Sequence, residues 1–256
     1  MRSSNAITTR HPALDGLAGA IDRLESRAVP SAPVTYLGLG WPGADAGAGG
    51  GLKWGAVHEW LSGDEHSTQR HWTPPLGVLI HIASRALAAG VSGGRIVWIG
   101  NRVHPNAQAM SAVSAHSLFV SADRASERLW AIDLACRSAG VAVVVADGSE
   151  LGMSESRRLQ LAASAGQTLC LLARPWREHK EISAAWTRWR VQPSMTPAVH
   201  PSWSVELLRC KGTQQTEEGA RRWTVQRDHE TSDVSVVSEL GGRLVAQTRP
   251  ALRAFA

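Results

Sequence analysis

The stretch from Val57 to Ala83 raises the question of nucleotide chemistry, because an apolar strand-like segment passes through a polar loop into an apolar helix-like segment. A phosphate loop occupies such a junction in nucleotide-binding α/β proteins. It needs glycine amides around the phosphates, a lysine for their charge and a hydroxyl for Mg²⁺. Here the loop starts at Gly63 and contains no lysine, and the acidic residues Asp64 and Glu65 follow the glycine. Their carboxylates would repel phosphate.

The start of the following helix also lacks the donors that an anion needs. Pro74 and Pro75 remove two backbone amides from the helix N-terminus, where a phosphate would bind. Arg70 could replace the missing lysine, but its spacing from Gly63 is wrong for that role. We therefore expect no nucleotide cofactor and no ATP hydrolysis.

Asp147 ends the apolar run "VAVVVAD", as a magnesium-binding Walker B aspartate does. Without a nucleotide to hold, that role has no substrate. The favoured interpretation is an aspartate that caps the end of a strand or the loop after it.

Cations and tryptophans alternate in "ARPWREHKEISAAWTRWRV", residues 173–191. Such a pattern suits single-stranded nucleic acid, because bases stack on aromatic rings while phosphates pair with cations. The predicted surface for DNA or a partner consists of Arg174, Trp176, Arg177 and Lys180, joined by Arg157 and Arg158 near the start of the preceding helix. The alternative is a half-buried strand with a solvated face, or plain solvated surface.

Composition restricts the class of protein. The net charge is +5 and the pI is about 9.7, carried almost wholly by arginine because the chain has three lysines. A GC-rich genome or a partner with phosphates or carboxylates would each explain that bias. No apolar run is long enough to span a membrane, and the N-terminus has no secretory signal. We expect a cytoplasmic protein with no membrane contact.

Cysteine and histidine give no metal-site pattern. Cys136, Cys170 and Cys210 are far apart in apolar contexts, so we expect small buried side chains in a reducing compartment. His66 and His71 share one loop but lack companions at ligand spacing, so we expect no metal.

The elements that must position these residues alternate between strand and helix after residue 54. Strands are predicted at 55–61, 95–100, 117–122, 141–147 and 168–174, and helices at 73–90, 123–140 and 154–166, with Thr73 and Asp123 as caps. This alternation predicts an α/β fold with a mainly parallel sheet flanked by helices. Strands without helices follow at 187–194, 203–210, 221–228 and 233–240, and they should extend one edge of the sheet as antiparallel hairpins.

The N-terminal part is predicted to be separate. Residues 14–25 have helical apolar spacing, and residues 28–52 are rich in Pro, Gly and Ala, which predicts a flexible joint. The resulting division is an N-terminal helix and linker at 1–33, a core at 34–242 and a tail at 243–256.

The order of the pieces resembles RecA-type recombinase cores. "GGGLKWGAVHEWLSG" looks like the lead-in and first strand of that fold, and "ADRASERLWAIDLACRSAGVAVVVADGSEL" resembles its helix and Walker B strand. In RecA-type cores the loop after the next strand faces DNA, which corresponds to residues 174–180 here.

Two families without the phosphate motif resemble the chain more closely. "SERLWAIDLACRSAGVAVVVADGSELGMSESRRLQLAASAGQTLCLLARP", residues 126–175, looks like the shared core of SulA-type division inhibitors and of the ImuA family. SulA-type chains stop soon after that strand. "AAWTRWRV", "WSVELLRCKG" and "RRWTVQRD" look like the C-terminal strands of the ImuA family, so the ImuA family is the closer resemblance.

This resemblance implies a non-enzymatic RecA-like adaptor in SOS-induced translesion synthesis and mutagenesis. Its implied partners are an ImuB-type polymerase-like protein and an error-prone C-family DNA polymerase, with RecA and single-stranded DNA as further candidates. The alternatives are a SulA-type division inhibitor that binds a tubulin-like GTPase, and an ATPase with an unconventional loop.

Overall fold

The computed structural model describes residues 36–240 except 64–71, 90–93, 108, 195–199, 213–221 and 229–232. The chain divides into two compact units, residues 1–34 and 35–256, and the first lies outside the described residues. The predicted helix at 14–25, the tail from residue 243, Arg70 and the two loop histidines also lie outside them.

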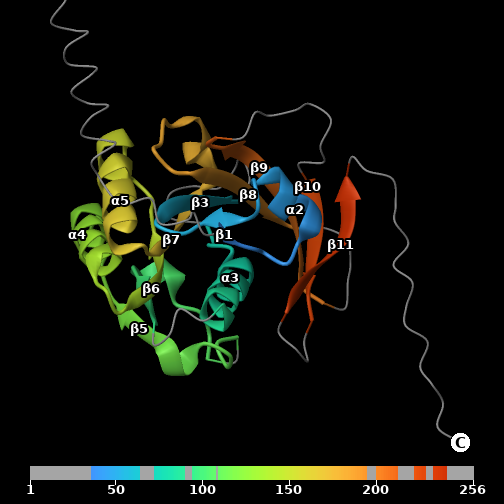
Figure 1. Cartoon of the computed structure of the whole chain (residues 1–256), viewed down its shortest axis with the longest axis horizontal. Coiled ribbons are helices and arrows are strands. Elements are labelled where there is room, and N and C mark those ends of the chain that lie inside the picture. Colours follow the sequence, from blue (N-terminus) through green and yellow to red (C-terminus); the bar gives the residue numbers. More distant parts are fainter. Residues whose placement is uncertain are drawn as a thin grey trace, which may run out of the picture. The chain divides into compact units, whose positions relative to one another are not determined.

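A mixed sheet of nine strands is the centre of the described part of the chain, in the order β11-β10-β9-β8-β3-β7-β6-β4-β5 (Figure 1). The parallel strands are β3 (Ala56–Ser62), β4 (Arg95–Ile99), β5 (Ser117–Val120), β6 (Val141–Asp147) and β7 (Leu169–Pro175). The predicted parallel α/β sheet is therefore confirmed.

The remaining strands extend the sheet beyond β3. They are β8 (Thr187–Pro193), β9 (Ser202–Cys210), β10 (Arg222–Arg227) and β11 (Val234–Leu240). Strand β8 is parallel to β3, and each following pair is antiparallel. The predicted antiparallel extension of one edge is also confirmed.

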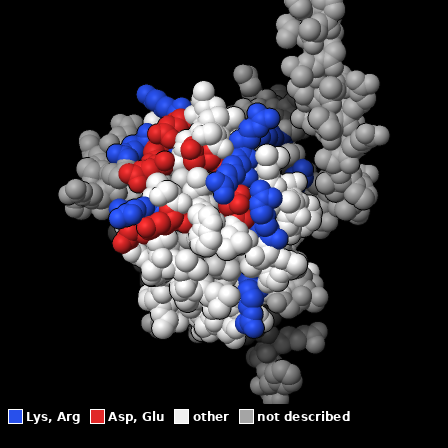
Figure 2. All heavy atoms as spheres, turned by 90° about the vertical axis from the view of Figure 1, so that its left-hand side faces the viewer, with Lys and Arg blue, Asp and Glu red and all other residues white. Residues whose placement is uncertain are grey.

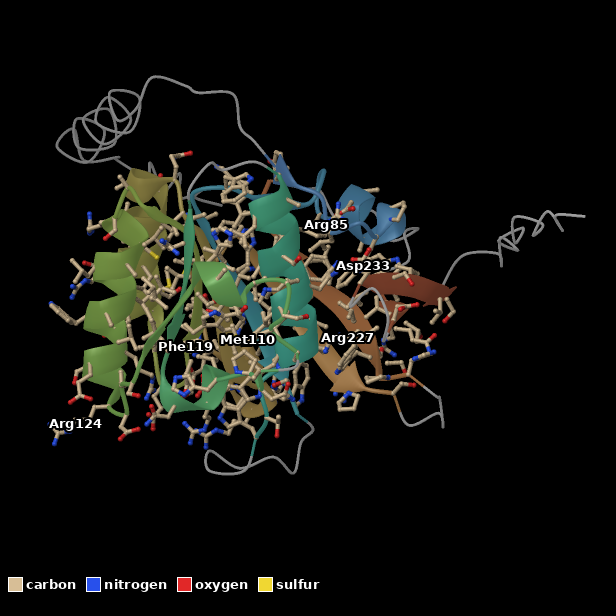
Figure 3. All side chains as sticks on the ribbon, turned by 90° about the horizontal axis from the view of Figure 1, so that it is seen from below. Arg85, Met110, Phe119, Arg124, Arg227 and Asp233 are labelled. Carbon is tan, nitrogen blue, oxygen red and sulfur yellow. The ribbon has the colours of Figure 1, made fainter. Side chains whose placement is uncertain are left out.

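Helices cover both faces of the parallel part (Figures 1 and 3). One face carries α4 (Ala125–Arg137) and α5 (Met153–Gly166), and the other carries α3 (Leu76–Ala88). Short 3₁₀ turns lie at Asn101–Val103 (η1), Ser114–His116 (η2) and Trp176–Lys180 (η3). Cys136, Cys170 and Cys210 are all buried in these two cores, as predicted.

Both predicted helix caps are wrong. Helix α3 begins at Leu76 rather than near Thr73, because a residue that precedes proline is disfavoured in the α region. Helix α4 begins at Ala125 with Arg124 as its cap, and the Glu127 side chain accepts from the Arg124 amide at 3.3 Å. Asp123 instead accepts a hydrogen bond from the Asn101 amide group.

The predicted flexible joint is wrong for its described part. Residues 36–53 form the short strands β1 (Tyr36–Leu37) and β2 (Leu52–Lys53) and the helix α2 (Pro42–Gly47). Gly51 has φ +116°, and a Cβ there would lie 2.2 Å from the Leu37 carbonyl oxygen. Its backbone freedom therefore serves a tight pairing of β1 with β2 rather than mobility.

Trp41 anchors this lead-in to distant parts of the fold. The ring is fully buried, stacks on His81 of α3 with a centroid distance of 5.5 Å, and donates its indole N–H to the Val234 carbonyl at 2.8 Å. The lead-in, α3 and β11 are thereby joined into one core. Among the described helices, none is long and apolar enough to cross a membrane.

Candidate functional site

Helix α3 follows the position expected for a phosphate loop. The Leu76 amide donates to the Pro74 carbonyl at 2.8 Å, and the amides of Val78 and Leu79 donate to the Pro75 carbonyl at 3.0 and 3.1 Å. Three of the backbone donors that an anion would use at the start of α3 therefore already have partners.

Trp203 of β9 covers the same turn of α3. A Cβ at Gly77 would lie 2.6 Å from this indole ring, so Gly77 is needed for the close approach of the tryptophan. The residues of the loop between Gly63 and Trp72 are outside the described part.

Asp147, the Walker-B-like residue, is almost fully buried and paired. One carboxylate oxygen accepts from the Arg102 guanidinium at 3.0 Å, and the other accepts from the Ser149 amide at 3.0 Å and hydroxyl at 2.6 Å. The aspartate thus caps the loop after β6, the interpretation favoured from sequence, and a guanidinium supplies the positive charge beside it.

The predicted DNA-facing surface after β7 is wrong for Arg174. This side chain is 0% exposed, and its guanidinium contacts the carboxylates of Glu59 at 2.9 Å, Glu178 at 2.8 Å and Glu181 at 3.0 Å. It also donates to the Leu151 carbonyl at 2.9 Å. An arginine with all of these partners joins strand β3, strand β7 and η3, and it is not available to a ligand.

Glu59 is the centre of this buried network. Burial alone would raise the pKa of its carboxyl, but the guanidinium groups of Arg174 and Arg188 and the Ser183 hydroxyl outweigh burial and hold the pKa below its ordinary value. Arg188 Nε lies 2.7 Å from Glu59, and the Ser183 hydroxyl donates to Glu59 at 2.6 Å. The carboxylate therefore stays ionised and fully paired, as a buried charge must be.

Arg188 also holds the segment that follows η3. Its guanidinium donates to the carbonyls of Glu178, His179 and Glu181 at 2.9 to 3.2 Å. The backbone between β7 and β8 is thereby fixed against the sheet.

Trp176 is likewise unavailable for base stacking, contrary to the prediction. The ring is buried between the Arg190 guanidinium, 3.8 Å from its centroid, and the His179 ring, which stacks at 4.2 Å. Both faces of the indole are occupied by side chains of the same molecule.

The other predicted cations lie in different surroundings. Arg177 and Lys180 are exposed, and Arg177 lies 3.8 Å from the mostly buried Glu178. Arg158 lies in the second turn of α5 and pairs with Asp133 of α4 at 3.2 Å, so it needs no outside anion. Arg157 is exposed and lies near Arg209 and Lys211, two cations that the sequence interpretation did not include.

An apolar surface that the sequence interpretation missed lies at the β5 end of the sheet. Strand β5 pairs on one side with β4, and Leu118, Phe119 and Val120 are 52%, 49% and 37% exposed. Helix α4 adds Trp130 and Leu134, 63% and 53% exposed. We call Leu118, Val120, Trp130 and Leu134 the β5–α4 surface. Phe119 points to the other face of the sheet, where its ring lies beside those of Trp98 and His104.

A hollow of about 370 Å³ borders this surface at Val120 and Trp130. It is lined by Val120, Ser121, Ala122, Ser126, Glu127, Trp130 and Ala131. The sequence feature that could have indicated this surface is the run "SLFV". It is apolar at successive positions, and therefore on both faces of its strand. Strands with that pattern are normally covered on both faces, whereas this one is open.

The chain is similar in sequence to a curated bacterial protein. Protein ImuA from two strains of Caulobacter vibrioides is 29% identical over 203 residues, which cover 70% of this chain and 80% of that protein. No protein-family model matches the chain.

The fold is similar to the crystal structure of the RadB recombinase. The TM-score is 0.55 at 11% sequence identity, and the match covers 79% of this chain and 100% of RadB. The chain therefore has a RecA-like fold.

Proposed function

We propose that this chain is a non-enzymatic, RecA-like adaptor of damage-induced translesion DNA synthesis. The proposal draws on the resemblance to the ImuA family in residues 126–175 and in the C-terminal strands, and on the similarity to Protein ImuA of Caulobacter vibrioides. Its proposed partners are an ImuB-type polymerase-like protein and, through it, an error-prone C-family DNA polymerase.

The observation that carries an adaptor role is the β5–α4 surface. An apolar edge strand has an unpaired row of backbone donors and acceptors, and another chain can pair with it as an additional strand. Trp130 and Leu134 beside it supply the kind of aromatic and apolar contact that dominates protein interfaces. We propose that an extended apolar segment of the ImuB-type protein pairs with β5 and places a side chain in the hollow beside Trp130.

The absence of enzymatic activity is proposed from the phosphate-loop position. The amides of Leu76, Val78 and Leu79 donate to proline carbonyls, and Trp203 packs on Gly77. The Arg102 guanidinium pairs with the Asp147 carboxylate, which a Walker B role would need for magnesium. An adaptor of this kind uses the RecA-like body as a rigid scaffold.

Co-expression tests the proposed function against its alternatives. The tagged full chain should retain the ImuB-type protein of the same genome and should not retain the tubulin-like division GTPase. Titration with Mg-ATP in a calorimeter should give no binding heat, and the complex should survive without nucleotide. Retention of the GTPase alone would support a SulA-type inhibitor, and micromolar ATP affinity would support an ATPase.

A further inference from the structure

The cations at the end of β9 are held differently from most arginines of the described chain. Arg102, Arg158 and Arg174 each pair with a carboxylate. Arg209, in contrast, donates to the carbonyls of Ser183 and Ala185 at 2.9 and 2.8 Å, and the Lys211 ammonium donates to the Ala184 carbonyl at 2.6 Å. Carbonyl groups orient these cations but do not cancel their charge.

Arg157 of α5 follows Ser156, whose hydroxyl accepts from the Ala184 amide at 2.8 Å, so it lies close to the residue that Lys211 binds. Partial burial lowers the pKa of Lys211, and the nearby charges of Arg209 and Arg157 lower it further. None of the three forms an ion pair with an acidic side chain of the described residues. We call Arg157, Arg209 and Lys211 the basic cluster.

The acidic side chains near the basic cluster are engaged elsewhere. Glu59, whose charge acts on Arg209, is paired with Arg174 and Arg188. Glu206 of β9 pairs with Arg222 at 2.7 Å, and Glu181 is bound by Arg174. Figure 2 shows Lys and Arg side chains gathered along the right half of the face that includes α4 and α5, with an acidic side chain among them, whereas the left half carries more acidic side chains mixed with basic ones. The fold thus leaves excess positive charge on this side, at a cost in repulsion that a bound polyanion would remove.

The aromatic rings in this region favour contact with a backbone rather than with bases. Arg190 and His179 cover both faces of Trp176, and the Lys53 ammonium lies 3.8 Å from the centroid of Trp186. Lys53 adds a further cation, and the Lys211 amide donates to the Trp186 carbonyl at 2.9 Å, which places Lys211 beside the same residue. Phosphodiester groups match this set of cations, because cations bind phosphates without reading the base sequence.

We infer that the basic cluster binds the phosphodiester backbone of nucleic acid. This surface comprises the α5 residue Arg157 and the end of β9, and it is separate from the β5–α4 surface. It would hold an adaptor on its template without sequence preference. The inference rests on charge and placement, and it does not depend on the identity of the protein partner.

The test is fluorescence anisotropy of the full chain with a labelled oligothymidylate, a mixed-sequence strand of equal length and the corresponding duplex. Arg157→Glu combined with Lys211→Glu should weaken binding at least about tenfold, and equally for the two single strands. The slope of log K against log salt should fall in magnitude by about 0.7 for each lost single-strand contact. Arg209 is left intact because it holds the backbone of residues 183–185.

Arg95→Glu is the matched control. Arg95 is exposed at the start of β4, and β8, β3, β7 and β6 separate that strand from β9. With about 4.8 Å between neighbouring strands, the two positions are separated by more than the Debye length of about 10 Å at 0.1 M salt. The control also replaces a cation by glutamate, and it should bind the oligonucleotides nearly as the wild type does.

A second readout uses the three lysines of the chain. After reductive methylation with ¹³C-formaldehyde, the NMR signal of Lys211 should move when oligothymidylate is added, and Arg157→Gln should raise its titration midpoint. Circular dichroism checks that the variants are folded, and Arg157→Gln with Lys211→Gln repeats the test without charge reversal. Unchanged DNA binding in both double variants would overturn the inference. Displacement of the oligonucleotide by a more tightly bound polyglutamate peptide would also overturn it, in favour of an acidic protein partner.

Discussion

Arg174 and Glu59 are 115 positions apart in the sequence, yet their side chains form one buried ion pair. The alternation of cations and tryptophans in residues 173–191 predicted an exposed site because a pattern of residue types contains no record of distant acidic partners. The period of two in the same stretch correctly placed Trp189 and Val191 on a buried face, but the face expected to be solvated contains Arg188, which is buried against Glu59. Whether an arginine faces a ligand is thus decided by tertiary contacts.

The buried His58 side chain predicts how the free energy of unfolding depends on pH. The ring is fully buried, with Nδ1 at 2.7 Å from the Thr187 hydroxyl and Nε2 at 2.9 Å from the Lys53 carbonyl. Burial is the main cause that lowers the pKa of His58 to about 4, and the nearby Lys53 charge adds to it. The unfolded chain, with a pKa near 6.5, then binds this proton more readily than the folded protein.

The free energy of unfolding should therefore be fully maintained above about pH 6.5 and should fall as the pH drops towards 4, by about 3 kcal/mol from this group. Chemical denaturation at several pH values, compared between the wild type and His58→Gln, isolates the contribution. The variant should be less stable at neutral pH but should lack this part of the pH dependence. Parallel curves for the two proteins would show that His58 is not buried as a neutral ring.

Among the helices and strands, hydrophobic periodicity predicted the positions of the sheet strands well, but it did not predict the short elements of the lead-in at residues 36–53. The run at 141–147 coincides with β6, because a strand covered on both faces must be continuously apolar. The lead-in at 36–53 contains many Gly and Ala residues, which were interpreted as a flexible joint. In the structure Ala44 and Ala48 are buried, and Gly51 permits a close approach of two strands. Small residues thus serve close packing here, and composition alone cannot distinguish that from mobility.

The close contact between the end of α5 and the end of α4 predicts different effects on stability when two glycines, Gly166 and Gly140, are replaced by alanine. A Cβ at Gly166 would lie 1.9 Å from the Cys136 carbonyl oxygen, whereas a Cβ at Gly140 would have no heavy atom within 4 Å. Gly166→Ala should lower the free energy of unfolding by about 2 kcal/mol or more, because the helices must separate. Gly140→Ala should change it by less than about 0.5 kcal/mol.

Thermal and urea unfolding of the two alanine variants measure this difference. Each adds one methyl group to a glycine in the same part of the fold, so the comparison isolates the packing of α5 on α4. Equal stability of the two variants would mean that the close approach at Gly166 is absent in solution.

At the scale of the whole molecule, the RecA-like sheet positions two surfaces at different places. The parallel part ends in the exposed strand β5, and the antiparallel part ends in β11. The sequence predicted the sheet and its extension, because alternation of strands and helices dictates layers. It did not predict the β5–α4 surface, because the order of strands in space decides which apolar strand becomes an edge.

We propose that the β5–α4 surface binds the ImuB-type partner. Trp130→Ser tests it, with Val237→Ser as the matched control, because Val237 is a 51% exposed apolar residue on the opposite edge strand, β11. Neither residue is buried, so both variants should unfold at nearly the temperature of the wild type.

The decisive measurement is the dissociation constant of the full chain with the purified ImuB-type protein, by isothermal titration calorimetry, for the wild type and both variants. Loss of an interface tryptophan typically costs about 2 kcal/mol or more, so Trp130→Ser should weaken binding by about thirtyfold or more while Val237→Ser leaves it unchanged. Wild-type affinity for Trp130→Ser, or an equal loss in both variants, would contradict the claim.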